Sequence, residues 1–150
     1  MTDGLPYVTR ATSDDAQGLT ICIDAAYAPH RAAGIDLPPV SCGVAEDIAQ
    51  NHVWVARDGA VIAGGLILQI DGSEAYLKNV AVHPAYGSQG IGGALMRTAL
   101  DAARAAGCRV IQLTTHAAMP GNIALYQHLG WHETRREGNK VAMQRSLDEG

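Results

Sequence analysis

Two Asp-Gly pairs, at residues 58–59 and 71–72, separate three runs that are rich in β-branched and other apolar residues. The three runs are residues 52–57, 60–70 and 73–82. An Asp-Gly pair between such runs is the strongest short-range signal for a β-hairpin, because both residues of the favoured two-residue turn need positive φ. The sequence therefore predicts an antiparallel three-stranded meander in the middle of the chain.

A long helix is predicted before the meander, over residues 12–30, with Thr12 or Ser13 as its N-cap. Leu19, Ile23 and Tyr27 follow at helical spacing and predict its buried side. The remaining predicted elements are a strand at 7–12, a loop at 31–43, a short helix at 44–51, a helix at 90–107, a strand at 108–116, a helix at 121–130 and two strands around residues 138–139.

The helix at 90–107 is strongly amphipathic in this reading. Its predicted buried face carries Ile91, Leu95, Ala99, Ala102 and Ala106. Strands and helices thus mix along the chain, which predicts a mixed-sheet α/β fold. With 150 residues, 47% of them hydrophobic and 17% charged, we expect residues 1–150 to form a single domain.

Composition excludes several classes of protein. A net charge of −4 argues against a broad basic face for nucleic acid. No apolar run is long enough for a signal peptide or a membrane span, so we expect a soluble protein without a membrane partner. Three cysteines, Cys22, Cys42 and Cys108, lack CxxC spacing, which favours reduced thiols in the cytoplasm over disulfides or a zinc site.

The stretch "GSQGIGG", residues 87–93, holds four glycines between a predicted strand and a predicted helix. The N-terminus of a helix presents unpaired N–H groups and partial positive charge, and glycine lets a phosphate approach them closely. A turn with close helix packing is the alternative reading. The stretch lacks the Lys and Ser/Thr of a P-loop, and Leu95 stands where a Rossmann fingerprint needs its third glycine.

Two motifs together carry a family resemblance. "VAVHPAYGSQGIGGALM", followed about 30 residues later by "NIALYQHLGW", resembles the GNAT superfamily of acyl-CoA-dependent N-acyltransferases. The resemblance implies a mixed, mostly antiparallel sheet of six to seven strands flanked by about four helices. It also implies acetyl-CoA as co-substrate, with no metal.

The resemblance assigns cofactor binding to one strand end, the glycine loop and the later motif. The residues are Val80, Ala81, Val82, Gly87, Ser88, Gln89, Gly90, Ile91, Gly92, Gly93, Asn122 and Tyr126. This chain departs from the family pattern in two places. Gly87 stands where Arg or Gln is usual, and Asn122 lies four rather than seven residues before Tyr126.

The implied reaction is direct attack of a neutral amine on the thioester. Tyr126, at the family's tyrosine position, is the candidate acid for the departing thiolate. Tyr76 and Thr114 align with positions where the family often has a glutamate base, so His116 is the candidate base instead. Glu74 and Asp71 are alternatives that would act through a water chain.

The acceptor is expected to be a small-molecule amine, contacted by Tyr27, His30 and Arg31 on and after the first long helix. Tyr27 is equally compatible with a core position. Two other functions stay open, a protein or peptide N-acetyltransferase and a non-catalytic acyl-CoA-binding regulator. A homodimer is also compatible with the resemblance.

Overall fold

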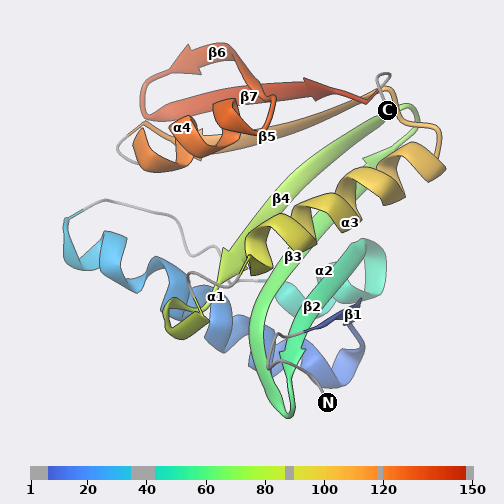
Figure 1. Ribbon diagram of the computed structural model, residues 1–150, viewed down its shortest axis with the longest axis vertical. Coiled ribbons are helices and arrows are strands. Elements are labelled where there is room, and N and C mark those ends of the chain that lie inside the picture. The colour runs from blue at the N-terminus through green and yellow to red at the C-terminus, as the bar shows by residue number, and fades with distance from the viewer. Residues whose placement is uncertain (1–6, 35–42, 87–89, 118–119, 148–150) are drawn as a thin grey trace. The chain divides into compact units, whose positions relative to one another are not determined.

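The structure, a computed structural model, describes residues 7–34, 43–86, 90–117 and 120–147. Its strands are β1 (Tyr7–Arg10), β2 (His52–Asp58), β3 (Val61–Asp71), β4 (Glu74–Val82), β5 (Val110–His116), β6 (His132–Glu137) and β7 (Lys140–Ser146). Its α-helices are α1 (Ala16–Ala32), α2 (Val44–Gln50), α3 (Ile91–Ala105) and α4 (Pro120–His128), with 3-10 turns at Ser13–Asp15 and Pro84–Tyr86 (Figure 1).

The seven strands form one sheet in the order β1-β2-β3-β4-β5-β7-β6. β4 and β5 pair in parallel, whereas β1 with β2, β2 with β3, β5 with β7 and β6 with β7 are antiparallel. The predicted mixed sheet and its flanking helices are therefore confirmed. Both predicted hairpins are also present, but Asp58 and Asp71 are the last residues of β2 and β3, so the turns comprise residues 59–60 and 72–73. Gly59 and Gly72 have positive φ, whereas the two aspartates do not.

Contacts divide the chain into two compact units. The first holds residues 1–68 and 79–99, and the second holds residues 69–78 and 100–150. β3, β4 and α3 each contribute residues to both units. The single domain expected for residues 1–150 stays a prediction.

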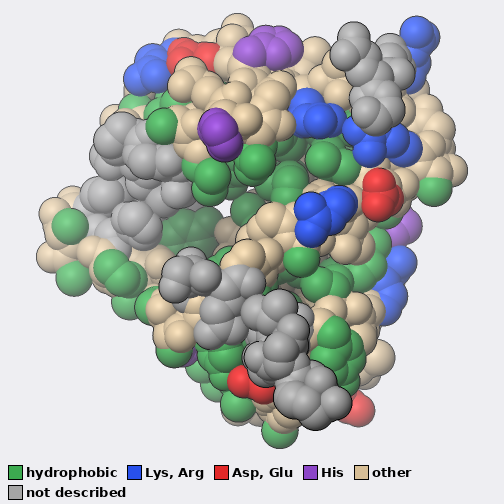
Figure 2. Space-filling view, viewed as in Figure 1, with side chains coloured by type: hydrophobic (Ala, Val, Ile, Leu, Met, Phe, Trp, Pro, Cys, Tyr) green, Lys and Arg blue, Asp and Glu red, His purple; other side chains and the backbone are tan. Residues whose placement is uncertain are grey.

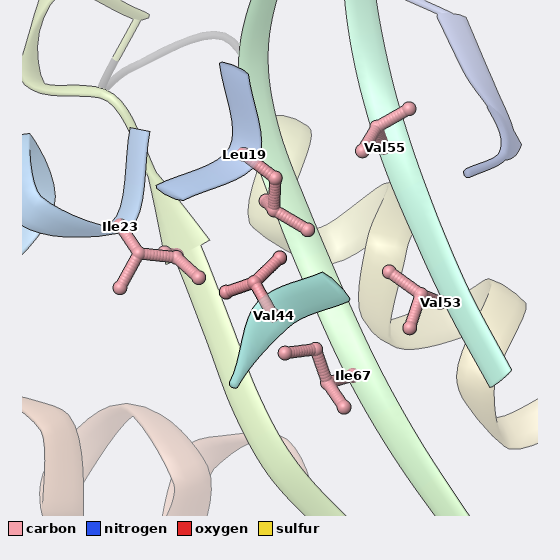
Figure 3. Packing of buried hydrophobic residues seen from close by; sticks show 7 residues of the cluster. Leu19, Ile23, Val44, Val53, Val55 and Ile67 are labelled. Carbon is pink, nitrogen blue, oxygen red and sulfur yellow. The ribbon is translucent and has the colours of Figure 1, made fainter. Parts of the chain in front are cut away.

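The core of the first unit lies between α1, α2 and the strands β2 and β3. Figure 3 shows its apolar side chains, which come from both helices and both strands and point toward one another. The cluster comprises Leu19, Ile23, Val44, Val53, Val55, Ile67 and Ala81, with Tyr27 partly buried against it. The helical spacing of Leu19 and Ile23 thus identified the buried side of α1 correctly.

A capping box begins the chain's first helical segment. The carboxylate of Asp15 accepts a hydrogen bond from the backbone N–H of Thr12 at 2.8 Å, so Thr12 is the N-cap. The same carboxylate pairs with the Arg57 guanidinium of β2 at 2.5 Å. That cation is the main reason why the pKa of Asp15 lies below its ordinary value. The cap therefore also ties α1 to the sheet.

Gly64 and Gly65 let helices approach both faces of β3. A Cβ on Gly64 would lie 2.8 Å from Cγ2 of Ile91 on α3 and 3.0 Å from the carbonyl oxygen of Ala81. A Cβ on Gly65 would collide with Leu19 of α1. These glycines are thus required by packing.

In the second unit, β4 and β5 expose one face and bury the other. Their parallel register joins Glu74–Leu77 to Val110–Leu113. Ala75, Leu77, Ile111 and Leu113 are buried, which leaves the alternate residues of both strands on the opposite face. The buried face of β5 continues onto β7, where Leu113 lies opposite Met143.

The buried face of α3 differs from the predicted one toward its C-terminus. Ile91, Leu95 and Ala99 are buried as expected, but the next buried position is Ala103. Ala102 is intermediate and Ala106 is exposed beyond the end of the helix. The buried positions follow four-residue steps from Ile91 to Ala103, so the buried stripe turns slowly around a helix of 3.6 residues per turn, and the predicted three-residue step from Ala99 to Ala102 departs from it.

Lys or Arg and Asp or Glu side chains both occur on the surface visible in Figure 2, scattered among apolar and neutral polar ones. No helix among the described residues is both long enough and apolar enough to cross a membrane.

Candidate functional site

The N-terminus of α3 in the first unit carries the glycines that the sequence singled out. Gly90 adopts φ +76°, and its carbonyl accepts the first hydrogen bond of the helix from the N–H of Ala94 at 3.1 Å. The N–H groups of Ile91, Gly92 and Gly93 therefore have no acceptor within the helix. Gly87, Ser88 and Gln89 lie outside the described residues.

Few described atoms lie close to the glycines at this helix end in the first unit. A Cβ built on Gly90 or Gly93 would meet no described atom within 4 Å. The glycines here are thus not required by packing, in contrast to Gly64. Positive φ, three N–H groups and the helix dipole together fit a phosphate group, so the residues present are suited to the pyrophosphate of an acyl-CoA.

The end of β4 lies beside this helix start within the first unit. A Cβ on Gly92 would sit 3.7 Å from Cγ2 of Val82, and the N–H of His83 donates to the Ala63 carbonyl of β3 at 2.8 Å. Among the described residues of the first unit taken alone, β4 is the edge strand. Backbone groups along the edge of residues 79–82 can therefore pair with an extended ligand. Val80 and Val82 are half-buried there and Ala81 is buried.

Tyr27 points its hydroxyl to Asn79 of β4, with 3.5 Å between the Tyr27 oxygen and Asn79 Oδ1. Asn79 is buried, and Tyr27 is half-buried against the apolar cluster. Tyr27 thus combines a packing role with a polar contact on β4. His30 and Arg31 lie in the last turns of α1, and their side chains are outside what the structure describes.

Neither described cysteine has the properties of a nucleophile. Burial raises the pKa of Cys22 to about 11. A hydrogen bond with the His83 backbone lowers this pKa, but the effect of burial is larger. Burial also raises the pKa of Cys108. Because the thiolate is the reactive form, a raised pKa lowers the share of each thiol that can act as a nucleophile near neutral pH. Cys42 lies outside the described residues.

Tyr126 lies on α4 in the second unit, half-buried beside Trp131. The two ring centroids are 5.8 Å apart with the planes tilted by 59°, and the N–H of Trp131 donates to the Tyr126 carbonyl at 2.9 Å. Trp131 is buried, and its indole N–H has no hydrogen-bond partner in the part of the chain described. The backbone of Asn122 belongs to α4, but its side chain is not described.

The exposed face of β4 and β5 carries rows of polar side chains. The Tyr76 hydroxyl donates a hydrogen bond to the Thr114 hydroxyl oxygen at 3.0 Å. Gln112 donates to the Glu74 carboxylate at 3.1 Å. His116 shares this face because it follows Thr114 by two residues at the end of β5. The structure thus brings His116, Thr114 and Tyr76 to one face, together with Glu74.

The two cross-strand hydrogen bonds were not predicted from the sequence. The alternation of buried and exposed residues could have placed these side chains on one face, but the register between two parallel strands far apart in the chain cannot be read from either strand. Among the described residues, no three His, Cys, Asp or Glu side chains gather closely enough to hold a metal ion.

The model of the Acetyltransferase (GNAT) family matches residues 25–131. The [ribosomal protein bS18]-alanine N-acetyltransferase of Escherichia coli K12 is 38% identical over 72 residues, which cover 48% of this chain and 49% of that protein. The chain thus spans about half the length of the curated relatives that it matches.

Solved structures share the fold over nearly the whole chain. PaiA N-acetyltransferase from Thermoplasma acidophilum, in complex with coenzyme A, superposes with a TM-score of 0.84 at 16% identity, covering 93% of this chain and 98% of that one. The ribosomal-protein-S18-alanine N-acetyltransferase from Escherichia coli gives 0.72 at 21% identity, covering 94% and 93%.

Proposed function

The chain belongs to the GNAT family of acetyltransferases, and on that premise we propose that it transfers an acetyl group from acetyl-CoA to the primary amine of a small molecule. The observation that carries the proposal is the open, glycine-lined N-terminus of α3 beside the end of β4 in the first unit. It offers phosphate-binding N–H groups next to a strand edge.

Cofactor binding is proposed to use backbone atoms for the most part. The N–H groups of Ile91, Gly92 and Gly93 bind the pyrophosphate, and the edge of β4 at Val80–Val82 pairs with the amides of the pantetheine arm. Gly87, Ser88 and Gln89 are assigned to the same loop by the family resemblance. Asn122 is proposed as a further cofactor contact on the same ground.

The chemistry of the bound cofactor is that of an activated acyl thioester. An alkylammonium, with a pKa of about 10, must first lose a proton to become a nucleophile. His116 is proposed to accept it, since a neutral imidazole is a competent base near neutral pH. Glu74 and Asp71 are the alternatives, each acting through water.

Tyr126 is proposed to donate its hydroxyl proton to the departing thiolate of CoA. A thiolate has an intrinsic pKa of about 8.5, so a nearby donor assists its departure without being indispensable. No enzyme nucleophile is needed for direct attack, which agrees with the raised pKa of Cys22 and Cys108.

Acceptor contacts are proposed for Tyr27, His30 and Arg31. Tyr27 is supported by its polar contact with Asn79 on β4. His30 and Arg31 follow from their place at the end of α1, in the region that the family uses for acceptors.

A protein N-terminus is the second candidate acceptor. It is favoured by the 38% identity over 72 residues to an enzyme named for the alanine of a ribosomal protein. The two candidates separate in an assay of thiol release from acetyl-CoA against two panels, one of small primary amines and one of short peptides with free N-termini. Turnover confined to peptides would favour the second candidate, and no turnover with either panel would overturn the proposal.

A further inference from the structure

The last strand of the sheet, β6, has an edge that no described strand covers. It belongs to the second unit, and all six of its residues, His132–Glu137, are exposed. The backbone N–H and C=O groups along such an edge pair readily with a further strand. Four of the six side chains are charged at neutral pH, namely Glu133, Arg135, Arg136 and Glu137. The order of these charges therefore decides which strand can pair with β6.

The hydrogen bonds beside β7 show which backbone groups of β6 point to the uncovered edge. The N–H of Ala117 donates to the carbonyl of Asn139 at 2.8 Å, and the N–H of Leu147 donates to the carbonyl of Arg109 at 2.9 Å. Since antiparallel strands alternate between bonded and non-bonded pairs, the odd-numbered residues of β7 bond to β5 and its even-numbered residues bond to β6. A residue of β6 opposite an odd-numbered residue of β7 therefore directs its N–H and C=O to the edge.

Glu133 and Arg136 are the residues of β6 in that position, opposite Met143 and Val141. They lie three residues apart rather than two because the register shifts at Thr134. The shift also places both side chains on one face of the sheet, where the Arg136 guanidinium donates two hydrogen bonds of 3.0 Å to the Glu133 carboxylate. The outward backbone groups of β6 thus belong to one acidic and one basic residue.

A second copy of β6 fits this edge in an antiparallel register about a two-fold axis. Outward groups meet outward groups when Glu133 of one copy lies opposite Arg136 of the other, and the axis then repeats the pair. Each such pair exchanges two backbone hydrogen bonds, and each carboxylate gains a second guanidinium. The remaining cross-strand pairs also avoid like charges: His132 with Glu137, and Thr134 with Arg135.

A shift of this register by one residue removes both matches. In one direction Glu133 faces Glu137 and Arg135 faces its own copy, and in the other His132 faces Arg136. Charged residues on an edge strand ordinarily prevent pairing with strands of other sequence. On β6 the same charges leave one register with a strand of identical sequence, so they select a second copy of this chain as the partner.

From these observations we propose that this chain forms a homodimer in which β6 pairs antiparallel with β6 of the second copy, with the two-fold axis between Thr134 and Arg135. Within the second unit, α4 contacts β6 and exposes Leu125 and Leu129, which adds apolar surface beside the joined strands. Six residues per copy bury less surface than a permanent dimer needs, so we expect a reversible dimer that salt weakens. Pairing of this kind does not depend on acetyl transfer.

Sedimentation equilibrium of the full chain over a range of concentrations, at low and high salt, measures the dissociation constant of the dimer. In the Arg136→Glu variant, and likewise in Glu133→Arg, like charges face each other across the axis. We therefore expect dissociation constants at least about tenfold higher than that of the wild type. The double variant Glu133→Arg/Arg136→Glu restores both pairs and should dimerise nearly as tightly as the wild type. Thermal unfolding checks that each variant is folded.

The matched control is Arg97→Glu, which makes the same change in net charge on the exposed side of α3. It should leave the dissociation constant unchanged, which separates the register of β6 from overall repulsion between copies. A wild type that stays monomeric at its highest soluble concentration would overturn the proposal. So would a dimer that Arg136→Glu leaves intact, or a folded double variant that stays monomeric where the wild type dimerises.

Discussion

The two units differ in what their candidate residues provide. In the first unit, the N-terminus of α3 and the edge of β4 present backbone N–H and C=O groups, and side chains there are small or absent. In the second unit, the face of β4 and β5 presents side chains: hydroxyls, an amide, a carboxylate and an imidazole. A backbone site depends on where a helix begins and a strand ends, so many sequences can build it. A side-chain site changes with single substitutions, so acceptor chemistry can differ between members of one family.

The largest effect that we expect concerns the hydroxyl of Tyr126, on α4 of the second unit. Replacement of Tyr126 by Phe keeps the ring packed against Trp131 and removes the hydroxyl alone. If that hydroxyl protonates the leaving thiolate, kcat should fall by about 10²-fold with little change in affinity for acetyl-CoA. Steady-state thiol release, under conditions where chemistry limits turnover, measures both quantities.

The matched control is Tyr7→Phe, which removes an exposed hydroxyl from β1. It should leave kcat unchanged. An unchanged kcat in Tyr126→Phe as well would reduce Tyr126 to a packing residue, and the second unit would lose its proposed acid.

The ion pair between Asp15 and Arg57 tests how far the first unit depends on a side-chain contact. Replacement of Arg57 by Gln leaves the buried Asp15 carboxylate without its cation. We expect a loss of roughly 2–3 kcal/mol at pH 7, less than the full cost for a buried pair because a quarter of Arg57 is exposed. Urea unfolding measures the change, with Asp101→Asn as a surface control near zero.

The contribution of the Asp15–Arg57 pair to the free energy of unfolding should decrease at low pH. Arg57 lowers the pKa of Asp15 in the folded protein. The stability that the pair contributes is therefore fully present above the pKa of Asp15 in the unfolded chain, about 3.9. It is lost as the pH falls through the lower pKa of the folded protein. The stability difference between wild type and Arg57→Gln should therefore shrink below about pH 4. A difference that stays constant down to pH 2 would show that the pair does not set it.

Substitution of two glycines of the first unit by alanine compares a glycine required by packing, Gly64, with one that borders the proposed cofactor site, Gly93. Gly64→Ala places a Cβ against Ile91 and the Ala81 carbonyl and should cost about 1–3 kcal/mol. Gly93→Ala adds a Cβ to a helix where no described atom lies within 4 Å, so it should be neutral or stabilising by up to about 1 kcal/mol. Thermal unfolding of both variants checks this, and equal losses would contradict the distinction.

Local signals in the sequence predicted the elements well. The Asp-Gly pairs located both hairpin turns, and helical spacing identified the buried side of α1 through Leu19 and Ile23. The need for Gly64 and Gly65 depends on helices that cross β3 from distant parts of the chain, so no local pattern reveals it. The Tyr76–Thr114 hydrogen bond likewise depends on pairing between strands separated by α3 in the chain.

Calorimetric titration with coenzyme A tests the central claim most directly. The wild-type protein should bind CoA, and Gly90→Asp should bind it at least about tenfold more weakly, because a carboxylate would face the pyrophosphate. The Gly90→Asn variant separates the effect of the negative charge on CoA affinity from the effect of side-chain size. The Gly59→Asp variant makes the same change at another glycine with positive φ, in the β2–β3 turn, and should leave CoA affinity unchanged. Wild-type affinity in a folded Gly90→Asp variant, or no binding of CoA by the wild type, would contradict the account.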